Sequence, residues 1–236
     1  PSFWPSVPGV DSQGNVWVGD YGELRKYDGL SWQSFTPAAL DGESVFRIDF
    51  GPGDVRWLET SSGLMRYDPA ADEWQTFTPE HHPVLENISA MHVARNGALW
   101  LGGKGHLVRF DGETWHTPAA VRELTGYVTD IDQAADGSLW AIASGDLHHL
   151  ESDEAQWVRY NWPGDFWLEC LAVGPDGRIW VGHDGLGRFD PATQAWETFA
   201  PDDGLVNESV TAIHVTPEGV VWVGTTNGVS RYVVGE

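Results

Sequence analysis

Short apolar segments alternate with glycine-bearing turns along the whole chain. The clearest example is "VVWVGTTNGVSRY" at 220–232, in which an apolar run, a turn and a second alternating run follow one another. This pattern predicts a β-hairpin, because glycine supplies the positive φ angle that a tight turn between two strands requires. Related copies are "NVWVGDYGELRKY", "ALWLGGKGHLVRF" and "RIWVGHDGLGRF", which begin at Asn15, Ala98 and Arg178. The hairpin is therefore a repeat unit.

A tryptophan in the first strand of each hairpin marks the repeat, and we call it the anchor. The anchors are separated by 40, 43, 40, 40 and 42 residues. A glycine follows each anchor after five or six residues, and a second tryptophan follows each of the first five anchors after 15 to 17 residues. Each unit therefore holds four short strands and shows no helical periodicity. The anchors are Trp17, Trp57, Trp100, Trp140, Trp180 and Trp222.

One four-stranded sheet per repeat of about 40 residues is typical of a β-propeller blade. Six anchors predict an all-β protein, a single six-bladed β-propeller over 1–236. Copy six stops just before its second tryptophan is due, so we expect an incomplete last blade. We also expect 4–10 to form the first strand of blade one, made irregular by its prolines. The expected blades are approximately 4–37, 44–79, 87–119, 127–161, 167–201 and 209–236.

The motif "GxxWVGTxxGLxRYD…WxxF" resembles the repeat of the two-component-regulator propeller family, found in extracytoplasmic sensor regions of bacterial signalling proteins. The resemblance covers essentially the whole chain, and copy four ("LWAIASGDLHHLE") matches least well. It implies a propeller fold, a sensor role and an extracytoplasmic or periplasmic location. Streptogramin lyase propellers are more distantly similar. They carry "WFTE" where this chain reads, for example, "WVGD" or "WVGT", so a glutamate that helps to bind their metal has no counterpart and their activity is not implied.

Acidic residues dominate the composition. The chain has 35 Asp and Glu against 13 Lys and Arg, a formal net charge of −22. Such a charge repels phosphate backbones, so nucleic acid is not expected as a partner. The charge accounts for solubility, and a preference for cations or cationic surfaces is the functional alternative. No apolar run approaches the roughly 18 residues of a membrane helix, and no targeting segment is recognised. The single cysteine, Cys170, excludes an internal disulfide and a cysteine-based zinc site.

The first strand of each blade is expected to line the central channel of the propeller. Eight residues before the anchor, four copies carry ionisable side chains, and alternation along a strand places them at one level. Two carboxylates and two imidazoles suit zinc, manganese or nickel better than calcium. The alternative is a solvated channel without a cofactor, in which the aspartates and histidines hydrogen-bond through water. The four candidate metal ligands are Asp49, His92, Asp132 and His214.

Aromatic residues depart from the repeat where the chain enters some of the first strands. Thirteen residues before the anchor stand Trp4, Tyr127 and Trp167, and the linker "YNWPGDFW" adds Trp162. His183 follows a "WVG" segment in a turn on the same side. We predict that these five residues form a ligand-binding platform at the channel mouth, because aromatic faces with a few polar groups suit small-molecule recognition. The alternative is that the tryptophans fill gaps between blades.

Three functions remain open on the sequence alone. The first is a non-enzymatic propeller that binds a small molecule, sugar, peptide or another protein domain, resembling a sensor region. The second is a metal-dependent lyase or lactonase-like enzyme with its site in the channel. The third is a structural repeat module. The Asp/His set distinguishes the second function from the others, and the aromatic platform distinguishes the first from the third.

Overall fold

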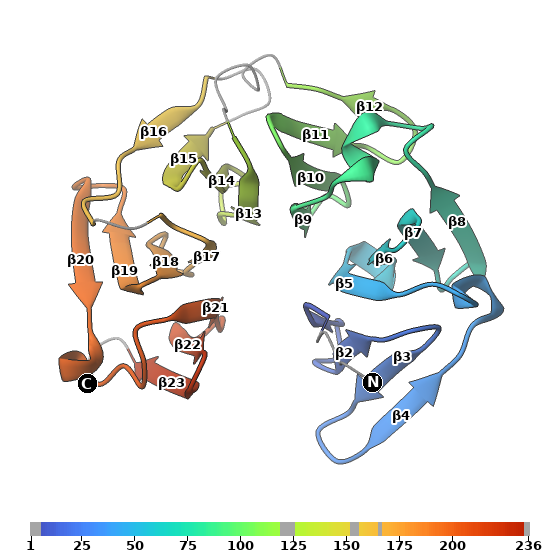
Figure 1. The fold of residues 1–236 in the computed structure, drawn as a ribbon, viewed down its shortest axis with the longest axis horizontal. Helices are drawn as coiled ribbons and strands as arrows, with labels where there is room; N and C mark the ends of the chain where they lie inside the picture. The colour runs from blue at the N-terminus through green and yellow to red at the C-terminus, as the bar shows by residue number, and fades with distance from the viewer. Residues whose placement is uncertain (1–5, 119–125, 152–155, 165–166, 234–236) are drawn as a thin grey trace. The chain divides into compact units, whose positions relative to one another are not determined.

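The repeat folds as a succession of small antiparallel sheets in the computed structural model of the chain (Figure 1). The structure describes residues 6–118, 126–151, 156–164 and 167–233. Five sheets have four strands and the sixth has three, which confirms the all-β six-bladed propeller and its incomplete last blade. Over the described ranges the helices are short 3-10 turns, and none is long and apolar enough to span a membrane.

The chain divides into two compact units. Unit 1 comprises Pro1–Leu101 and Val108–His116, and unit 2 comprises Gly102–Leu107 and Thr117–Glu236. Unit 1 holds blades one and two and most of blade three, and unit 2 holds blades four to six. Each unit is described by itself.

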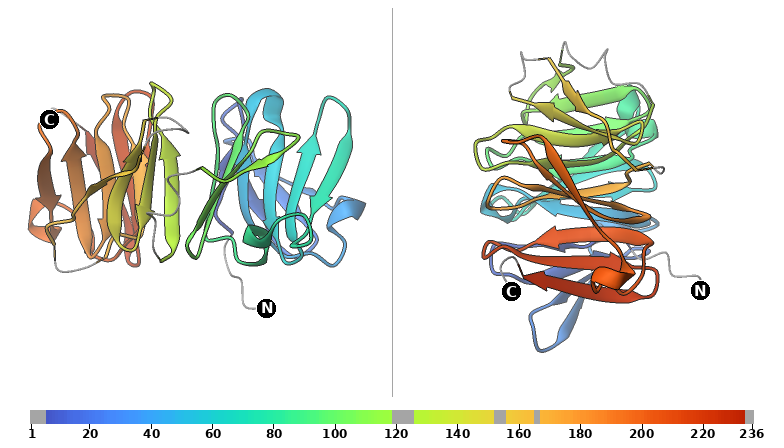
Figure 2. Two further views of the ribbon diagram at one scale, coloured as in Figure 1. Left: turned by 90° about the horizontal axis from the view of Figure 1, so that it is seen from above. Right: turned by 90° about the vertical axis from the view of Figure 1, so that its left-hand side faces the viewer.

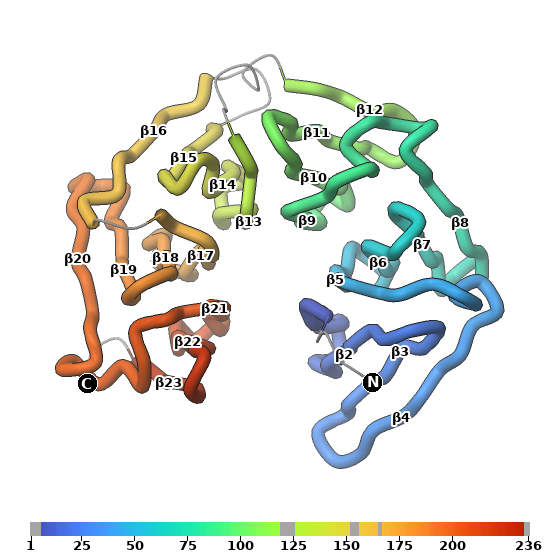
Figure 3. Tube along the Cα trace, viewed as in Figure 1, coloured from blue at the N-terminus to red at the C-terminus, as the bar shows by residue number. Residues whose placement is uncertain are grey.

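Blades one to three have these strands: β1 (Gly9–Val10), β2 (Val16–Gly19), β3 (Leu24–Tyr27) and β4 (Trp32–Phe35); β5 (Val45–Phe50), β6 (Arg56–Thr60), β7 (Gly63–Asp68) and β8 (Glu73–Phe77); β9 (Ala90–Val93), β10 (Leu99–Gly103), β11 (His106–Phe110) and β12 (Trp115–His116). Short 3-10 helices lie in the connections: η1 (Ala38–Leu40), η2 (Pro52–Asp54) and η3 (Pro83–Glu86). In Figure 3 the chain passes from the last strand of one blade to the first strand of the next, as from β4 to β5.

Blades four to six have these strands: β13 (Val128–Gln133), β14 (Leu139–Ala143), β15 (Asp146–Leu150) and β16 (Val158–Tyr160); β17 (Cys170–Val173), β18 (Ile179–His183), β19 (Gly185–Asp190) and β20 (Ala195–Phe199); β21 (Val210–Val215), β22 (Val220–Thr225) and β23 (Gly228–Val233). The 3-10 helix η5 (Pro201–Asp203) precedes β21. Figure 2 shows the sheets of blades five and six stacked one on the other, as their strand contacts require.

The anchor tryptophans join neighbouring sheets within each unit. In unit 1, the Trp57 ring meets Phe110 of the next blade edge to face, with 5.9 Å between centroids. In unit 2, Trp180 packs against Tyr232 of the next blade at 5.4 Å. Aromatic pairs of this kind contribute energy beyond the area they bury. The repeated tryptophans therefore form part of the hydrophobic packing between neighbouring blades.

The first strand of blade one is shorter than the sequence predicts. β1 contains only Gly9–Val10, whereas Val7 pairs in parallel with Arg47 of blade two. The Val7 N–H donates to the carbonyl of Phe46, and the Val7 carbonyl accepts from Ile48. The reason is that Pro8 has no N–H to donate to its own sheet. Residues 4 and 5 of the expected strand lie outside the described residues.

Candidate functional site

Two aspartates of the first strands connect neighbouring blades. In unit 1, Asp49 Oδ2 in β5 accepts the backbone N–H of Val93 in β9 at 2.7 Å. In unit 2, Asp132 Oδ2 in β13 accepts the backbone N–H of Val173 in β17 at 2.8 Å. In each aspartate, Oδ1 also accepts the N–H of the following residue at 2.7 Å. Both carboxylates that the sequence suggested as metal ligands thus bind backbone of the adjacent blade.

The two histidines of the predicted metal site lie in different units. His92 is half-buried in β9, on the strand beside the one that carries Asp49. His214 is exposed in β21. Within the described ranges, no group of three or more His, Cys, Asp or Glu side chains is arranged to hold a metal ion. The four-residue metal site remains a prediction.

Tyr127 and Trp167 of the predicted platform lie at strand entrances beside the turn between β14 and β15, to which the backbone of Tyr127 and Leu168 is hydrogen-bonded. The Ser144 N–H donates to the carbonyl of Tyr127 at 3.2 Å, and the Leu168 N–H donates to the carbonyl of Gly145 at 3.1 Å. A Cβ on Gly145 would lie 2.7 Å from the Trp167 side chain, so only glycine allows this approach. Tyr127 is 51% exposed and Trp167 76% exposed. The Trp167 ring therefore lies against this turn, whereas the Tyr127 ring has Lys104 Nζ 5.9 Å from its centroid, and both rings are open to solvent.

Trp162 and His183 have other surroundings. The Trp162 ring packs edge to face on Trp196 with 5.0 Å between centroids and belongs to the core between blades four and five. His183, at the end of β18, lies with Nε2 3.2 Å from a Glu169 carboxylate oxygen and Nδ1 3.6 Å from Asp184. Trp4 lies outside the described residues. Two of the five predicted platform residues, Tyr127 and Trp167, are thus exposed rings, Trp162 contributes to packing, and the platform itself stays a prediction.

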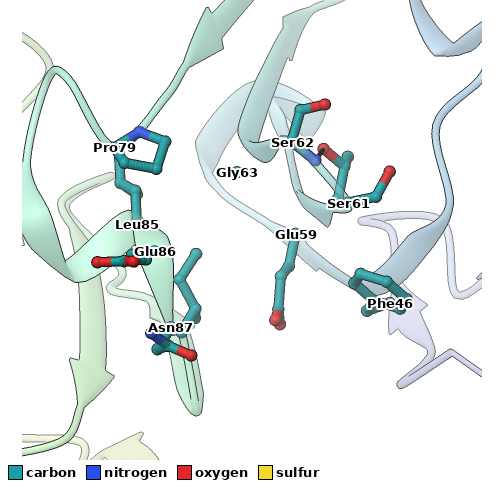
Figure 4. A pocket seen from close by; sticks show the side chains of 11 residues that line it. Phe46, Glu59, Ser61, Ser62, Gly63, Pro79, Leu85, Glu86 and Asn87 are labelled. Atoms are coloured by element: carbon teal, nitrogen blue, oxygen red, sulfur yellow. Dashed lines mark hydrogen bonds between the residues drawn. The ribbon is translucent and has the colours of Figure 1, made fainter.

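A pocket that the sequence interpretation missed lies in unit 1, between blades two and three (Figure 4). Its volume is about 440 Å³, within the range of small-molecule sites. One wall is the end of β6 with the turn into β7, and the other is formed by η3 and the residues that follow it. The lining residues are Phe46, Glu59, Thr60, Ser61, Ser62, Gly63, Pro79, Leu85, Glu86, Asn87 and Ile88.

The pocket arises where one copy departs from the repeat. Two residues after the anchor, four of the six copies have glycine, and blade two has Glu59. A Cβ on Gly19 would lie 2.3 Å from the Val45 side chain of the next blade, and one on Gly182 would lie 2.3 Å from Val210. Glycine at this position therefore allows the valine to pack tightly. In blade two the larger side chain excludes that packing, and the corresponding residue of the next blade, Ile88, lines the pocket instead. This departure from the glycine pattern was the available sequence signal.

Glu59 is a largely buried carboxylate with one charged neighbour. Its side chain is 16% exposed, and Oε2 lies 3.2 Å from Nη1 of Arg47. Burial raises the pKa of Glu59, and the Arg47 guanidinium partly opposes this shift. The other terminal nitrogen of Arg47 donates to the carbonyl of Ser89 at 3.2 Å. Among the described residues, the Glu59 carboxylate receives no hydrogen bond of good geometry, so it retains acceptor capacity toward the pocket.

Hydrogen bonds make the wall at the β6–β7 turn firm. Ser61 Oγ donates to Glu43 at 2.7 Å, and Ser62 donates to the same carboxylate from Oγ at 2.5 Å and from its backbone N–H at 3.1 Å. Burial raises the pKa of Glu43, but these hydrogen bonds outweigh burial and the net shift is downward. Glu43 therefore remains ionised and ties the turn to the connection before β5.

The opposite wall is a capped 3-10 helix. The His82 side chain accepts the N–H of Val84 through Nδ1 at 3.2 Å, which caps η3 at its start. The His82 ring also stacks on Trp115 of β12, with 5.2 Å between centroids. Val84 and Leu85, the middle residues of the helix, are buried. Both walls are thus held by contacts independent of any ligand.

Comparison with known proteins agrees with this fold. A model of the two component regulator propeller family matches residues 204–227, which confirms the resemblance read from the repeat. The search of the curated proteins finds no match.

Solved structures of low sequence identity share the fold. An extracellular domain assigned to a hybrid two component system, BT3049 of B. thetaiotaomicron, superposes with a TM-score of 0.79 at 16% identity over 95% of this chain. The virginiamycin B lyase of Staphylococcus aureus gives 0.72 at 14% identity, with 98% of this chain and 85% of the lyase covered. YCF48, solved with a D1 peptide, gives 0.65 at 16% identity, with 93% and 74% covered. The chain spans 33% of the BT3049 domain. These likenesses establish the propeller fold.

Proposed function

We propose that this propeller is a non-enzymatic recognition module that binds a small ligand in the pocket beside Glu59. The observation that carries the proposal is a pocket of about 440 Å³ whose walls are held by Glu43 and His82 and whose lining includes the Glu59 carboxylate, paired only with Arg47 among the described residues. A pre-formed concave site with few polar groups is the usual architecture of ligand recognition. No acid–base pair or nucleophile with its base is needed for this role.

The neighbours in structure support an extracytoplasmic sensor role. BT3049 is represented by an extracellular domain of a signalling system, and YCF48 was solved with a peptide bound. We infer that this chain acts outside the cytoplasm and recognises a small molecule, a peptide or another protein domain. We propose the exposed rings of Tyr127 and Trp167 as a second contact surface in unit 2.

The enzymatic alternative is a metal-dependent lyase or lactonase-like activity with Asp49, His92, Asp132 and His214 as ligands. It is less favoured because two of the four carboxyl or imidazole groups already accept backbone N–H groups of adjacent blades. The test is the metal content of untagged protein purified without added ions, repeated on His92→Ala. Stoichiometric metal that is lost in H92A would support the enzyme.

The proposed function is tested with Glu59→Gly, which restores the residue of the repeat. We expect the glycine to let Ile88 pack as Val45 packs on Gly19, so that the pocket is lost. A panel of amines, sugars, amino acids and short peptides is screened by thermal shift. A ligand present at 100 times its Kd stabilises the wild type by about 2.7 kcal/mol, and E59G should show no such shift. Ligands that stabilise both proteins equally would contradict the proposal.

A further inference from the structure

The charge around the pocket identifies the class of ligand. Two lining residues, Glu59 and Glu86, are acidic, and none of the lining residues is lysine or arginine. The nearby Arg47 has one terminal nitrogen engaged by the Ser89 carbonyl and the other beside Glu59. The chain also carries a formal charge of −22, which concentrates cations near its surface. Anionic ligands are therefore disfavoured.

The exposed aromatic ring of Phe46 lies on the same side of the pocket as the Glu59 carboxylate. Phe46 lies at a register shift between β5 and β6, where Val45 and Arg47 are paired and Phe46 is not. Such bulges redirect side chains. Phe46 is 45% exposed and lines the pocket on the same side as Glu59, as Figure 4 shows. An aromatic face attracts a cation, most strongly when the cation loses water.

The opposite side of the pocket is mixed in character. Glu86 and Asn87 present polar groups, and Pro79 and Leu85 present apolar ones. A bare metal ion would leave the apolar surface and most of the 440 Å³ unused. A cation attached to a short apolar body would use both the carboxylates and the hydrophobic wall.

We propose that the pocket binds an organic cation, a protonated amine or guanidinium on a short apolar body, with the charge at Glu59 and the body along Phe46. This inference rests on the proposed function and specifies its ligand. The ammonium donates to the Glu59 carboxylate, whose Oε2 lies 3.2 Å from Nη1 of Arg47, and supplies a second positive charge beside that of Arg47. The same chemistry is found in a free amine and in a lysine or arginine side chain of a peptide.

Three matched probes test the charge. Tyramine, tyrosol and 4-hydroxyphenylacetate share one aromatic body and carry a positive, no and a negative charge. We expect calorimetry on the 236-residue chain to give tyramine a Kd at least tenfold lower than that of tyrosol, and no binding of 4-hydroxyphenylacetate. Glu59→Gln should raise the tyramine Kd at least tenfold and leave that of tyrosol nearly unchanged. Phe46→Ala should weaken both.

Glu113→Gln is the matched control, because it removes one carboxylate from an exposed position outside the pocket. E113Q should bind tyramine as the wild type does, and melting curves of all variants confirm folding. A fourth probe, Nα-acetyl-lysine methylamide, which keeps the charged side-chain amine, distinguishes a peptide from a free amine as the natural ligand. If it binds more tightly than tyramine and E59Q weakens this binding, a peptide side chain is supported. If it binds more weakly than tyramine, a free amine is supported.

Three outcomes overturn the inference in distinguishable ways. Equal or tighter binding of tyrosol or 4-hydroxyphenylacetate, still lost in E59G, rejects the organic cation and keeps the pocket as a ligand site. Absence of any E59G-sensitive binding by the three probes and by the screening panel rejects the proposed function as well. Calcium binding that is lost in E59Q, with no binding of tyramine, also rejects the organic cation.

Discussion

The carboxylate of Asp132 in β13 accepts the backbone N–H of Val173 in β17, so a side chain of one blade is hydrogen-bonded to the main chain of the next. Asp130, two residues earlier on the same strand, accepts the N–H of Leu171 in the same way at 2.8 Å. Hydrogen bonds to an ionised acceptor are stronger than neutral ones. These aspartates therefore join blades four and five at the level of their first strands.

We expect Asp132→Ala to lower the free energy of unfolding by about 2 kcal/mol, because it removes two charge-assisted hydrogen bonds and leaves the Val173 N–H without its acceptor. Asp132→Asn should have a smaller effect. Urea denaturation monitored by tryptophan fluorescence measures both. Asp202→Ala, at an exposed position in η5, is the control and should change stability by less than about 0.5 kcal/mol. Equal stability of D132A and D202A would contradict the interpretation.

Asp11 gives a pH-dependent prediction. Burial raises its pKa, but hydrogen bonds from the Trp17 indole and from Asn15 outweigh burial and lower the pKa from 3.8 to about 2. A carboxyl whose pKa is lower in the folded state stabilises the fold above its unfolded pKa, and this stability is lost as pH falls from 3.8 toward 2. Because Asp11 is partly exposed, we expect Asp11→Asn to cost only about 1 kcal/mol at pH 7.

The difference between D11N and wild type should be constant from pH 7 to about pH 5 and shrink below about pH 4, where wild-type Asp11 begins to take up a proton in the unfolded state. Urea midpoints at pH 7, 5 and 3 measure it. Taking the difference between the two proteins cancels the titration of the other carboxylates. A difference that stays constant or grows as the pH falls to 3 would show that the pKa of Asp11 is not lowered.

Trp162 and Trp167 should differ in their contributions to stability. Trp162 packs on Trp196 and within reach of Gly187, so Trp162→Ala should cost about 3 kcal/mol. Trp167 is 76% exposed, and Trp167→Ala should cost less than about 1 kcal/mol. Thermal and urea unfolding test both variants. Similar losses in the two variants would argue against an exposed recognition surface at Trp167.

Trp222 differs from the other anchors. It is 42% exposed, whereas Trp180 of the preceding blade is 1% exposed beneath Tyr232. We expect Trp180→Ala to cost about 4 kcal/mol, as for a fully buried aromatic ring. Trp222→Ala should cost about half as much, because part of its surface is already hydrated. If the two variants were equally destabilised, the Trp222 ring would be buried in solution.

The sequence by itself determined the number and type of the blades. Each repeat carries its own anchor tryptophan, such as Trp180, and its own turn glycines, such as Gly177 and Gly185, both with positive φ angles. These signals act over a few residues, so spacing along the chain reports them directly. The three-stranded last blade followed from the same count. Tyr127 and Trp167, which the sequence suggested as part of a ligand platform, are both exposed, and their role in binding stays a prediction.

Only the tertiary structure decided what those side chains contact. The Asp49 and Asp132 carboxylates bind backbone about one repeat away, at Val93 and Val173, and no spacing rule shows an N–H that lies in the next blade. The pocket at Glu59 likewise depends on how closely two sheets approach. A single side chain in place of a glycine changes that approach, because packed interiors leave no room for added atoms. Contacts between blades, rather than patterns within them, therefore form the candidate site.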